Sequence, residues 1–351
     1  MLPIGRRRLL GNNAASFWNS LPCGDIEPMN RHLVDRRQFA ARCAAFGLSL
    51  PAASTIIALQ STSQALAATE APPGTAGRTV KFRDGTSATA LGQGSWHLGQ
   101  GRHPAAVEEE ALRLGISLGM TLIDTSGNYG AGRSEELISR VIATGRDRVF
   151  VVSKVEPDQV SGDGIARACE ASLARLGTSY LDLYLLHWPV PNAQFPTAIA
   201  GFEQLRAKKK IRAWGVSNFN VRQMEDLFRV PGGDRCATNQ VPYSLNNRGI
   251  ERDILPWCKQ RDIPVMAYSP LGGDNSPLVR DHTLAQIGAV HDCTAAAVAL
   301  AWAIRSGDVI AIPESGSPAH VKENAVALSL TLTPQELQTL DAAFPGPSGA
   351  N

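Results

Sequence analysis

Four polar residues with complementary chemistry lie between positions 124 and 187. Asp124 and Lys154 each end an apolar run, Tyr129 lies five residues after Asp124, and His187 ends another apolar run. A tyrosine hydroxyl can donate a proton to the oxygen that becomes charged when hydride adds to a carbonyl. A neighbouring ammonium stabilises the tyrosinate and brings proton transfer closer to physiological pH, and a carboxylate keeps that ammonium charged. A neutral histidine can orient the carbonyl and donate to the developing oxyanion, so the set predicts reduction of a carbonyl group.

Each of the four residues also has an ordinary structural explanation. Asp124 could cap the following helix, and Tyr129 could be a loop aromatic. Lys154 could be a solvated strand end, and His187 could be a hydrogen-bonded residue at the rim. The coincidence of all four at predicted strand ends favours the catalytic interpretation.

The elements that would position these residues alternate along the chain. Short β-branched runs alternate with longer amphipathic segments, which predicts a parallel sheet. The predicted strands are 88–92, 122–124, 149–154, 181–187, 211–217, 237–241, 264–269 and 309–313. Apolar residues at helical spacing predict helices that include 108–118, 134–142, 164–176 and 198–208. Eight strands in this order suit a closed barrel, so the predicted fold class is α/β, a (β/α)8 TIM barrel.

The predicted barrel occupies residues 79–351. Residues 80–82 and the Asp84-Gly85 turn predict a short N-terminal hairpin that caps the bottom of the barrel, and we expect extra helices near the C-terminus. In such barrels the catalytic groups come from the carboxyl ends of the strands and the loops after them. The four polar residues are therefore expected to converge on one cavity.

The four residues and several later motifs resemble the aldo-keto reductase family, from about residue 91 to the C-terminus. The family's Asp, Tyr, Lys and His tetrad falls at Asp124, Tyr129, Lys154 and His187. The later motifs follow in family order: Gly215-Val216-Ser217-Asn218, Asn239-Gln240, Ala267-Tyr268-Ser269-Pro270-Leu271 and Glu323-Asn324. The resemblance implies NAD(P)H-dependent reduction of aldehydes or ketones to alcohols by hydride transfer, with Tyr129 as general acid.

The resemblance also implies a nicotinamide site. Ser217, Asn218 and Gln240 match the residues that hydrogen-bond the carboxamide, and Tyr268 matches the aromatic that stacks on the ring, although it could simply pack in the core. The cofactor-binding residues implied beyond these are Gly94, Ser95, Ser269, Leu271, Ser315, His320, Glu323 and Asn324. Ser269 and Leu271 begin the loop that lies over the pyrophosphate in the family.

One segment departs from the family pattern. Glu314 stands where lysine is common, and His320 stands where arginine is common. Those cations grip the 2′-phosphate of NADPH, and an acidic residue would repel it. Ser315 is left as a possible phosphate donor, and Glu323 with Asn324 could contact adenine. NADP is therefore the first choice of cofactor and NAD a rival, while Glu314 could instead face solvent.

Two tryptophans are the candidate substrate contacts. Trp96 follows the first predicted strand and Trp188 follows His187, so both are expected at the rim, where either could instead pack against the protein. The motif order is most similar to bacterial members associated with methylglyoxal and diketogulonate reduction. A small carbonyl compound is therefore the expected substrate partner, although fold likeness does not determine the substrate.

The composition excludes several other function classes. The chain has 34 Lys+Arg and 32 Asp+Glu, and the basic excess lies in residues 1–67, so the barrel is mildly acidic and nucleic acid is not an expected partner. Cys169, Cys236, Cys258 and Cys293 are widely spaced and form no Cys/His cluster, so no metal site is expected. Buried free thiols are the simpler expectation, and a disulfide among them stays open.

The N-terminal region carries an export pattern. Arg36 and Arg37 precede a weakly apolar stretch, 43–59, and then Ala65-Leu66-Ala67, the order of a signal peptide. The pattern resembles the twin-arginine signal, which implies delivery of a folded protein to the periplasm by the twin-arginine export machinery. Cleavage is expected near Ala67, with no stable membrane insertion afterwards. The predicted parts are a leader, 1–67, and an Ala/Gly/Pro-rich linker, 68–78.

Two alternatives compete with this export signal. The arginine pair could be accidental, or the stretch could be an uncleaved anchor, for which it is short and broken by Pro51. Residues 1–28 are unusual ahead of such a signal, and initiation at Met29 would leave an n-region of ordinary length.

Two other function classes would keep the barrel. A nicotinamide-binding redox-sensing or partner-binding module would retain the nucleotide but show little turnover, and the intact tetrad argues against it. A hydrolase with paired carboxylates would need two suitably spaced acids at strand ends, and the predicted strand ends carry no such pair.

Overall fold

The computed structural model describes residues 78–347. These residues belong to the second of two units along the chain, Ala71–Asn351. The predicted leader lies outside the described residues, as does the predicted linker up to residue 77, so both stay predictions.

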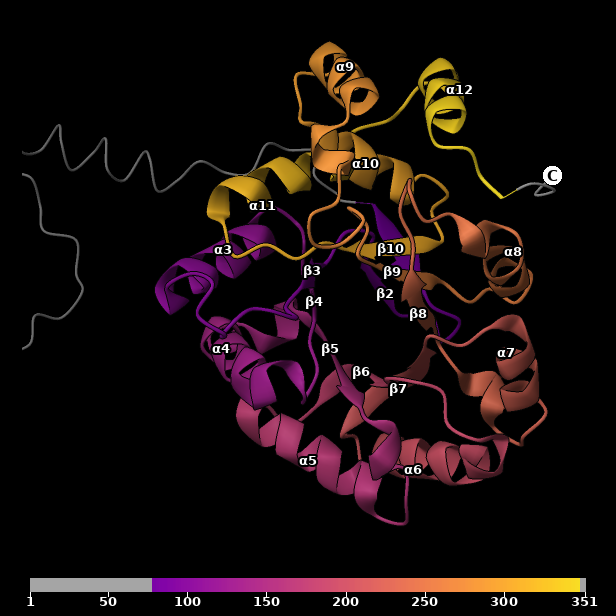
Figure 1. The fold of residues 1–351 in the computed structure, drawn as a ribbon. Coiled ribbons are helices and arrows are strands. Elements are labelled where there is room, and N and C mark those ends of the chain that lie inside the picture. The colour runs from indigo at the N-terminus through magenta and orange to yellow at the C-terminus, as the bar shows by residue number, and fades with distance from the viewer. Residues whose placement is uncertain (1–77, 348–351) are drawn as a thin grey trace, which may run out of the picture. The chain divides into compact units, whose positions relative to one another are not determined.

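Eight parallel strands form the centre of the molecule, with helices around them (Figure 1). The strands are β3 (Gln93–Gly94), β4 (Leu122–Asp124), β5 (Phe150–Val155), β6 (Leu181–Leu186), β7 (Ile211–Ser217), β8 (Asn239–Pro242), β9 (Val265–Tyr268) and β10 (Val309–Ile312). They are hydrogen-bonded in sequence order from β3 to β10. Isolated parallel bridges from Leu91 to Ala311 and from Gly94 to Glu314 join the first strand to the last. The predicted (β/α)8 barrel is confirmed.

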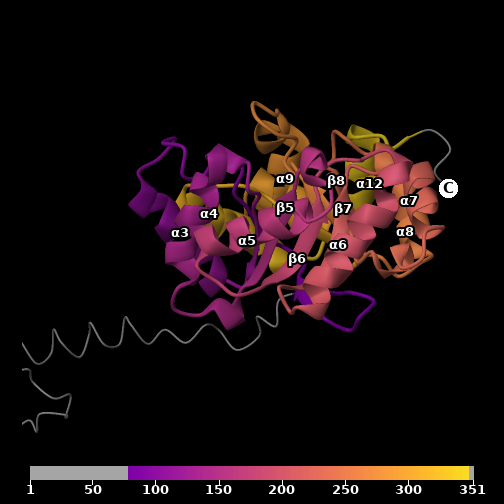
Figure 2. The ribbon, with the colours of Figure 1, turned by 90° about the horizontal axis from the view of Figure 1, so that it is seen from below.

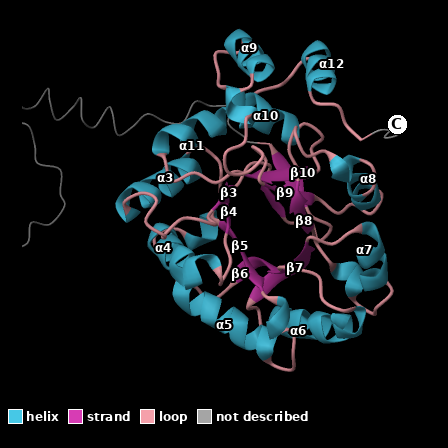
Figure 3. Cartoon of the chain, viewed as in Figure 1, coloured by secondary structure: helices cyan, strands magenta, loops and turns pink. Residues whose placement is uncertain are grey.

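A ring of helices follows the strands one by one (Figure 3). Its members are α3 (Ala105–Ser117), α4 (Arg133–Ile142), α5 (Gly164–Leu176), α6 (Phe195–Ala207), α7 (Val221–Phe228), α8 (Ile254–Lys259), α10 (Ala295–Ala303) and α11 (Pro318–Ala325). Two further helices, α9 (His282–Val290) and α12 (Pro334–Ala343), lie outside the ring, and His291 after α9 contacts Glu336 of α12 at 2.6 Å. The expected extra helices are therefore present.

The N-terminal hairpin consists of β1 (Thr79–Lys81) and β2 (Ser87–Thr89), paired antiparallel. Phe82 stacks on Phe150 at the start of β5, with ring centroids 5.6 Å apart, so the hairpin covers the amino ends of the strands. In Figure 2 the indigo hairpin segment lies at the edge of the barrel opposite α9. The predicted strand 88–92 is wrong as one element, because its first residues pair in the hairpin and the barrel strand begins at Gln93.

Alternation along each strand determines which side chains enter the barrel. On β6, Leu183 and Leu185 share a core cluster with residues of the neighbouring strands, whereas Tyr184 and Leu186 belong to a second cluster with residues of the surrounding helices. Side chains on a strand alternate between its two faces, so His187, two residues after Leu185, continues the inward series. His187, the polar residue at the end of this series, therefore lies at the carboxyl end of the barrel.

The same alternation positions the other two strand residues of the predicted tetrad. Leu122 and Val152 belong to the same core cluster as Leu183 and Leu185, and Asp124 and Lys154 lie two residues further along β4 and β5. Asp124 and Lys154 are each only 2% exposed. Inside the barrel, a layer of apolar side chains therefore lies beneath the charged pair Asp124 and Lys154.

Among the described helices, none is long and apolar enough to cross a membrane alone. The pair α9 and α10 meets the length and composition criteria only together, and it is bent by 91°. Every residue of α10 is buried in the protein. The apolar character of α10 is therefore explained by its place in the core.

The four cysteines of the described region are free thiols. Cys169, Cys236 and Cys258 are buried, and Cys293 is partly exposed. Burial raises the pKa of each of the three buried thiols to about 12. These cysteines therefore behave as core residues rather than nucleophiles.

Candidate active site

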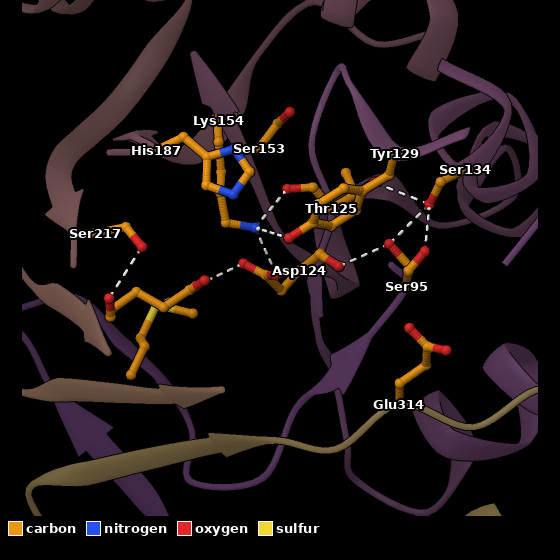
Figure 4. Close-up of polar contacts among 12 residues, drawn as sticks. Ser95, Asp124, Thr125, Tyr129, Ser134, Ser153, Lys154, His187, Ser217 and Glu314 are labelled. Carbon is orange, nitrogen blue, oxygen red and sulfur yellow. Dashed lines mark hydrogen bonds and ion pairs between the residues drawn. The ribbon is translucent and has the colours of Figure 1, made fainter. Parts of the chain in front are cut away.

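The four predicted catalytic residues converge at the carboxyl end of the barrel (Figure 4). Lys154 Nζ donates to Asp124 Oδ2 at 2.7 Å and lies 3.0 Å from the Tyr129 hydroxyl. The Tyr129 and His187 rings meet edge to face with centroids 5.9 Å apart. A phenol, an ammonium, a carboxylate and an imidazole therefore form one connected group, as the sequence predicted.

Tyr129 comes from a turn rather than from a strand. It begins a short 3-10 segment, Tyr129–Gly132, in which Gly130 has φ +58 and Ala131 has φ +57. A left-handed backbone costs least at glycine, so the Gly130 and Gly132 positions suit this sharp turn. The turn brings the phenol back over β4, close to the end of Lys154.

Asp124 and Lys154 are held by further bonds that the sequence did not reveal. Gln240 Nε2 donates to Asp124 Oδ1 at 2.7 Å, so each carboxylate oxygen has a separate partner. Lys154 Nζ also donates to the backbone oxygen of Thr125 at 2.9 Å. Ser95 Oγ donates to the backbone oxygen of Asp124 at 2.8 Å. The side chain of Lys154 is therefore directed at the phenol by partners from three sides.

Burial and the neighbouring charges together control the protonation of the phenol and the ammonium. Burial raises the pKa of Tyr129, and the nearby Lys154 offsets only part of this. Burial also disfavours charge on Lys154, but Asp124 and then Tyr129 outweigh it and the pKa of the lysine is raised. The sequence led us to expect that the ammonium lowers the pKa of the phenol towards physiological pH. The ammonium does act in that direction, but the net shift of the Tyr129 pKa is upward. Near neutral pH the site holds a protonated phenol beside a charged lysine.

A cavity of about 810 Å³ opens above these residues. Its lining includes most of the predicted site residues: Gly94, Ser95, Trp96, Asp124, Tyr129, His187, Trp188, Ser217, Asn218, Gln240, Tyr268, Ser269, Leu271, Ser315 and His320. Lys154 lies beneath the lining, and Glu323 and Asn324 lie on α11 outside it. Trp96 and Trp188 are 59% and 49% exposed, as expected for residues at a mouth. The cofactor and substrate contacts themselves stay predictions.

The residues expected around a nicotinamide form a connected polar wall. The Asn218 side chain, at a residue with φ +65, donates to Ser217 Oγ at 3.1 Å and accepts from the Tyr268 hydroxyl at 3.0 Å. Tyr268 is half-buried, so part of its ring borders the cavity. A carboxamide needs both donors and acceptors, and a nicotinamide ring needs a flat apolar surface. The wall supplies all three, so these residues fit the group.

Glu314 has partners that neither sequence interpretation anticipated. Its Oε2 accepts from the backbone nitrogen of His97 at 2.9 Å, and its Oε1 lies 2.9 Å from His97 Nδ1. Its side chain is 24% exposed, and it lies apart from the contacts of the tetrad in Figure 4. His97 is also 4.0 Å from Asp274, which pairs with Arg102 at 3.2 Å. Glu314, His97, Asp274 and Arg102 therefore form a chain of polar contacts at the rim, which we call the rim network.

A second acid, Glu156, lies at the site and was not identified from the sequence. Glu156 Oε1 lies 2.5 Å from His187 Nδ1. The available signal was its position: Glu156 follows the end of β5 in the same way that His187 follows the end of β6. Within residues 78–347 no group of three or more His, Cys, Asp or Glu side chains is placed to hold a metal ion.

Comparison with known proteins identifies the family to which the barrel belongs. The model of the aldo/keto reductase family matches residues 90–344. The chain belongs to the aldo/keto reductase family. It is 46% identical over 273 residues to methylglyoxal reductase YeaE of Escherichia coli K12, covering 77% of this chain and 96% of that protein. The family assignment establishes an oxidoreductase that reduces carbonyl groups with a nicotinamide cofactor.

Solved structures of other members agree with this assignment. An aldo/keto reductase from Klebsiella pneumoniae in complex with NADP and acetate is 42% identical, with a TM-score of 0.75, over 78% of this chain and 98% of that chain. An aldo-keto reductase from the same organism in complex with NADPH gives 42% identity and a TM-score of 0.74, over 79% of this chain and 98% of that chain. The predicted family is therefore confirmed for the barrel.

Proposed function

We propose that this enzyme reduces small 2-oxo aldehydes to hydroxy compounds with NADPH. The observation that carries the proposal is the 3.0 Å contact between the Lys154 ammonium and the Tyr129 hydroxyl at the floor of the cavity. The relative named methylglyoxal reductase, 46% identical, supports this substrate class. Two related structures that contain NADP or NADPH support the choice of cofactor.

The chain's own residues supply the proton and the charge stabilisation. When bound, the reduced nicotinamide supplies hydride to the carbonyl carbon. Tyr129 donates its proton to the carbonyl oxygen, which completes the alcohol. The phenolate left behind lies beside the Lys154 ammonium, and Asp124 keeps that lysine charged. His187 borders the same cavity and can donate to the oxygen as its charge develops.

The cavity also contains groups suited to a phosphorylated nucleotide. Arg280, His320 and Ser315 line it, and Glu314 is occupied by His97 rather than left as a lone acid. Cationic and hydroxyl donors together suit a 2′-phosphate dianion. This arrangement supports NADPH over NADH.

The decisive experiment is titration of the purified protein with NADPH and NADH, followed by an aldehyde panel. We expect tighter binding of NADPH and oxidation of it with methylglyoxal and related 2-oxo aldehydes. Nucleotide binding without turnover of any aldehyde would favour a sensing or partner-binding module instead. Turnover only with large apolar aldehydes would contradict the substrate class.

We further propose that the protein is exported folded to the periplasm, with its nucleotide already bound. Arg36 and Arg37 ahead of an Ala-rich stretch support the twin-arginine route, which carries folded proteins. Cell fractionation should place the wild type in the periplasm and an Arg36→Lys/Arg37→Lys variant in the cytoplasm. Equal distribution of the two would contradict the route, and periplasmic protein that lacks nucleotide and binds it weakly would contradict loading before export.

A further inference from the structure

The imidazole of His187, which lines the cavity, has a carboxylate partner, Glu156, that is not part of the lining. Glu156 Oε1 is 2.5 Å from His187 Nδ1, and the histidine side chain is 11% exposed. Because a carboxylate only accepts hydrogen bonds, Nδ1 must carry the proton in this contact. The inference developed from this pair rests on the proposed carbonyl reduction.

The backbone brings the two residues together. Strands β5 and β6 are neighbours in register, with Val155 opposite Leu186, so the next residues, Glu156 and His187, lie side by side. The backbone nitrogen of His187 donates to the oxygen of Val155 at 2.9 Å, which extends the pairing past the strand ends. The contact is therefore positioned by the pairing of two neighbouring strands, directly after their last residues.

The backbone around Glu156 restricts its orientation. Glu156 precedes Pro157 and is extended, with φ −77 and ψ 152, which is the conformation that a following proline favours. Its backbone nitrogen donates to Gln159 Oε1 at 3.2 Å. The backbone of Glu156, and with it the direction in which the side chain leaves the chain, is therefore fixed.

The groups facing His187 differ on its several sides. Tyr129 lies edge-on to the ring, with Lys154 behind the phenol, and Trp188 stacks with centroids 6.0 Å away. Asn218 Nδ2 donates to the backbone oxygen of His187 at 3.2 Å and not to the ring. Glu156 is thus the anionic group in contact with the ring within the described residues.

This pairing constrains what the other ring nitrogen can do. A neutral histidine has one ring proton, and in this contact that proton is on Nδ1. Nε2 then has only a lone pair and cannot donate to a carbonyl oxygen. A doubly protonated ring has protons on both nitrogens, so it can bond Glu156 and donate from Nε2 at once. The sequence-based expectation of a neutral donor conflicts with this geometry.

We propose that Glu156 is a positioning residue that makes His187 donate to the substrate oxygen only as the doubly protonated imidazolium. The carboxylate neutralises that positive charge and leaves Nε2–H for the carbonyl oxygen. As pH rises and the ring loses one proton, the remaining proton stays on Nδ1 and the donor on Nε2 is lost. Reduction should therefore weaken as pH rises for a reason separate from Tyr129.

The first test measures the imidazole directly, without substrate or nucleotide. Nitrogen-15 NMR of the purified protein distinguishes protonated from unprotonated ring nitrogens, and a His187→Gln spectrum assigns the signals among the seven histidines. We expect the neutral ring of His187 to carry its proton on Nδ1. In Glu156→Gln the amide can donate to Nδ1, so we expect a larger share of the tautomer protonated on Nε2. A wild-type neutral ring protonated on Nε2 would overturn the proposal, even if the variant did not fold.

A matched control uses a second carboxylate–imidazole pair, which does not line the cavity. Glu336 Oε1 lies 2.6 Å from Nε2 of His291, and neither residue lines the cavity, so Glu336→Gln removes a similar carboxylate from a similar imidazole. This control should leave the His187 signals and the activity as in the wild type. A change there equal to that of Glu156→Gln would indicate a general effect of lost charge.

The second test is the pH dependence of kcat/KM for methylglyoxal. In the wild type, kcat/KM should decrease as pH rises and His187 loses its second proton. In Glu156→Gln this decrease should be absent, because the neutral ring can still donate from Nε2. The ratio of kcat/KM in the variant to that in the wild type should therefore increase as pH rises. Identical profiles, with kcat lowered uniformly, would reduce Glu156 to a structural role. If no aldehyde were turned over, the proposed function would fail while the NMR result still decided the pairing.

Discussion

The charged pairs at the floor of the cavity differ from those at its rim. At the floor, the side chains of Lys154 and Asp124 are 0% and 3% exposed, and they are 2.7 Å apart. At the rim, the side chains of Arg102 and Asp274 are 50% and 62% exposed, and they are 3.2 Å apart. A buried charge depends on its partner, whereas water can replace a partner at the surface. The floor is therefore expected to control chemistry and stability, and the rim to adjust cofactor preference.

The largest expected effect is the loss of the phenolic proton at the floor. Tyr129→Phe should lower kcat by about 10²–10⁴-fold, the usual contribution of general acid catalysis. Nucleotide affinity should stay close to that of the wild type, because the ring is kept. Steady-state kinetics and fluorescence titration with NADPH test both parts. A kcat within a few-fold of the wild type would assign the proton to another group.

The next largest effect concerns the stability of the buried pair. Lys154→Met leaves Asp124 buried without its cation and should lower the free energy of unfolding by about 3–5 kcal/mol. The double variant Lys154→Met/Asp124→Asn should recover part of this loss, because no charge is left unpaired. Urea unfolding provides the measurement.

The matched control for this prediction is the exposed pair. Arg102→Met should leave the urea midpoint nearly unchanged, because water and salt screen its interaction with Asp274. Equal losses in Lys154→Met and Arg102→Met would contradict the distinction between floor and rim.

A smaller effect is expected from the charge at position 314. Glu314→Lys should tighten NADPH binding by about tenfold, equal to about 1.4 kcal/mol, and leave NADH binding little changed. The reason is that an anion near the expected 2′-phosphate is replaced by a cation. Glu314→Gln removes the negative charge without adding a positive one, so its NADPH affinity should lie between those of the wild type and Glu314→Lys. Equal changes for both nucleotides would mean that Glu314 acts only through His97.

The smallest expected effect is the change in folding stability that each buried titratable group causes as pH rises. Burial raises the pKa of Tyr129, of Tyr184 and of the buried cysteines above their usual ranges. These groups keep their protons when folded, while the unfolded chain loses protons above about pH 9, so folding stability decreases as pH rises. Lys154 acts in the same direction, because its raised pKa gives a contribution that is lost as pH rises through the folded value.

Thermal unfolding measured from about pH 7.5 to about pH 11 checks this sign. The midpoint should fall progressively on the alkaline side, and Tyr184→Phe should make the fall shallower because it removes one buried phenol. A midpoint that stayed constant across this range would show that the buried groups titrate as they do in water.

Much of the barrel was predictable because each strand carries a local signal. The segments 122–124 and 211–217 agree with β4 and β7 residue for residue, and 164–176 agrees with α5. The first strand was misplaced because Ser87–Thr89 pairs with β1, and hydrogen bonds to a distant partner leave no local pattern. Boundaries elsewhere moved by one to three residues because strand ends depend on the neighbouring strand.

The sequence by itself determined the barrel, the apolar alternation inside it and the residue types at the strand ends, because these depend on local periodicity. Only the tertiary structure decided how the charges pair. Gln240 and Asp124 are in contact although they are 116 positions apart in the sequence. The corresponding separations are 217 positions for Glu314 and His97, and 31 positions for Glu156 and His187. Such contacts follow from strand register and from the loops that return to the barrel, and they determine which ring nitrogen faces a carboxylate and which acid already has a hydrogen-bond partner.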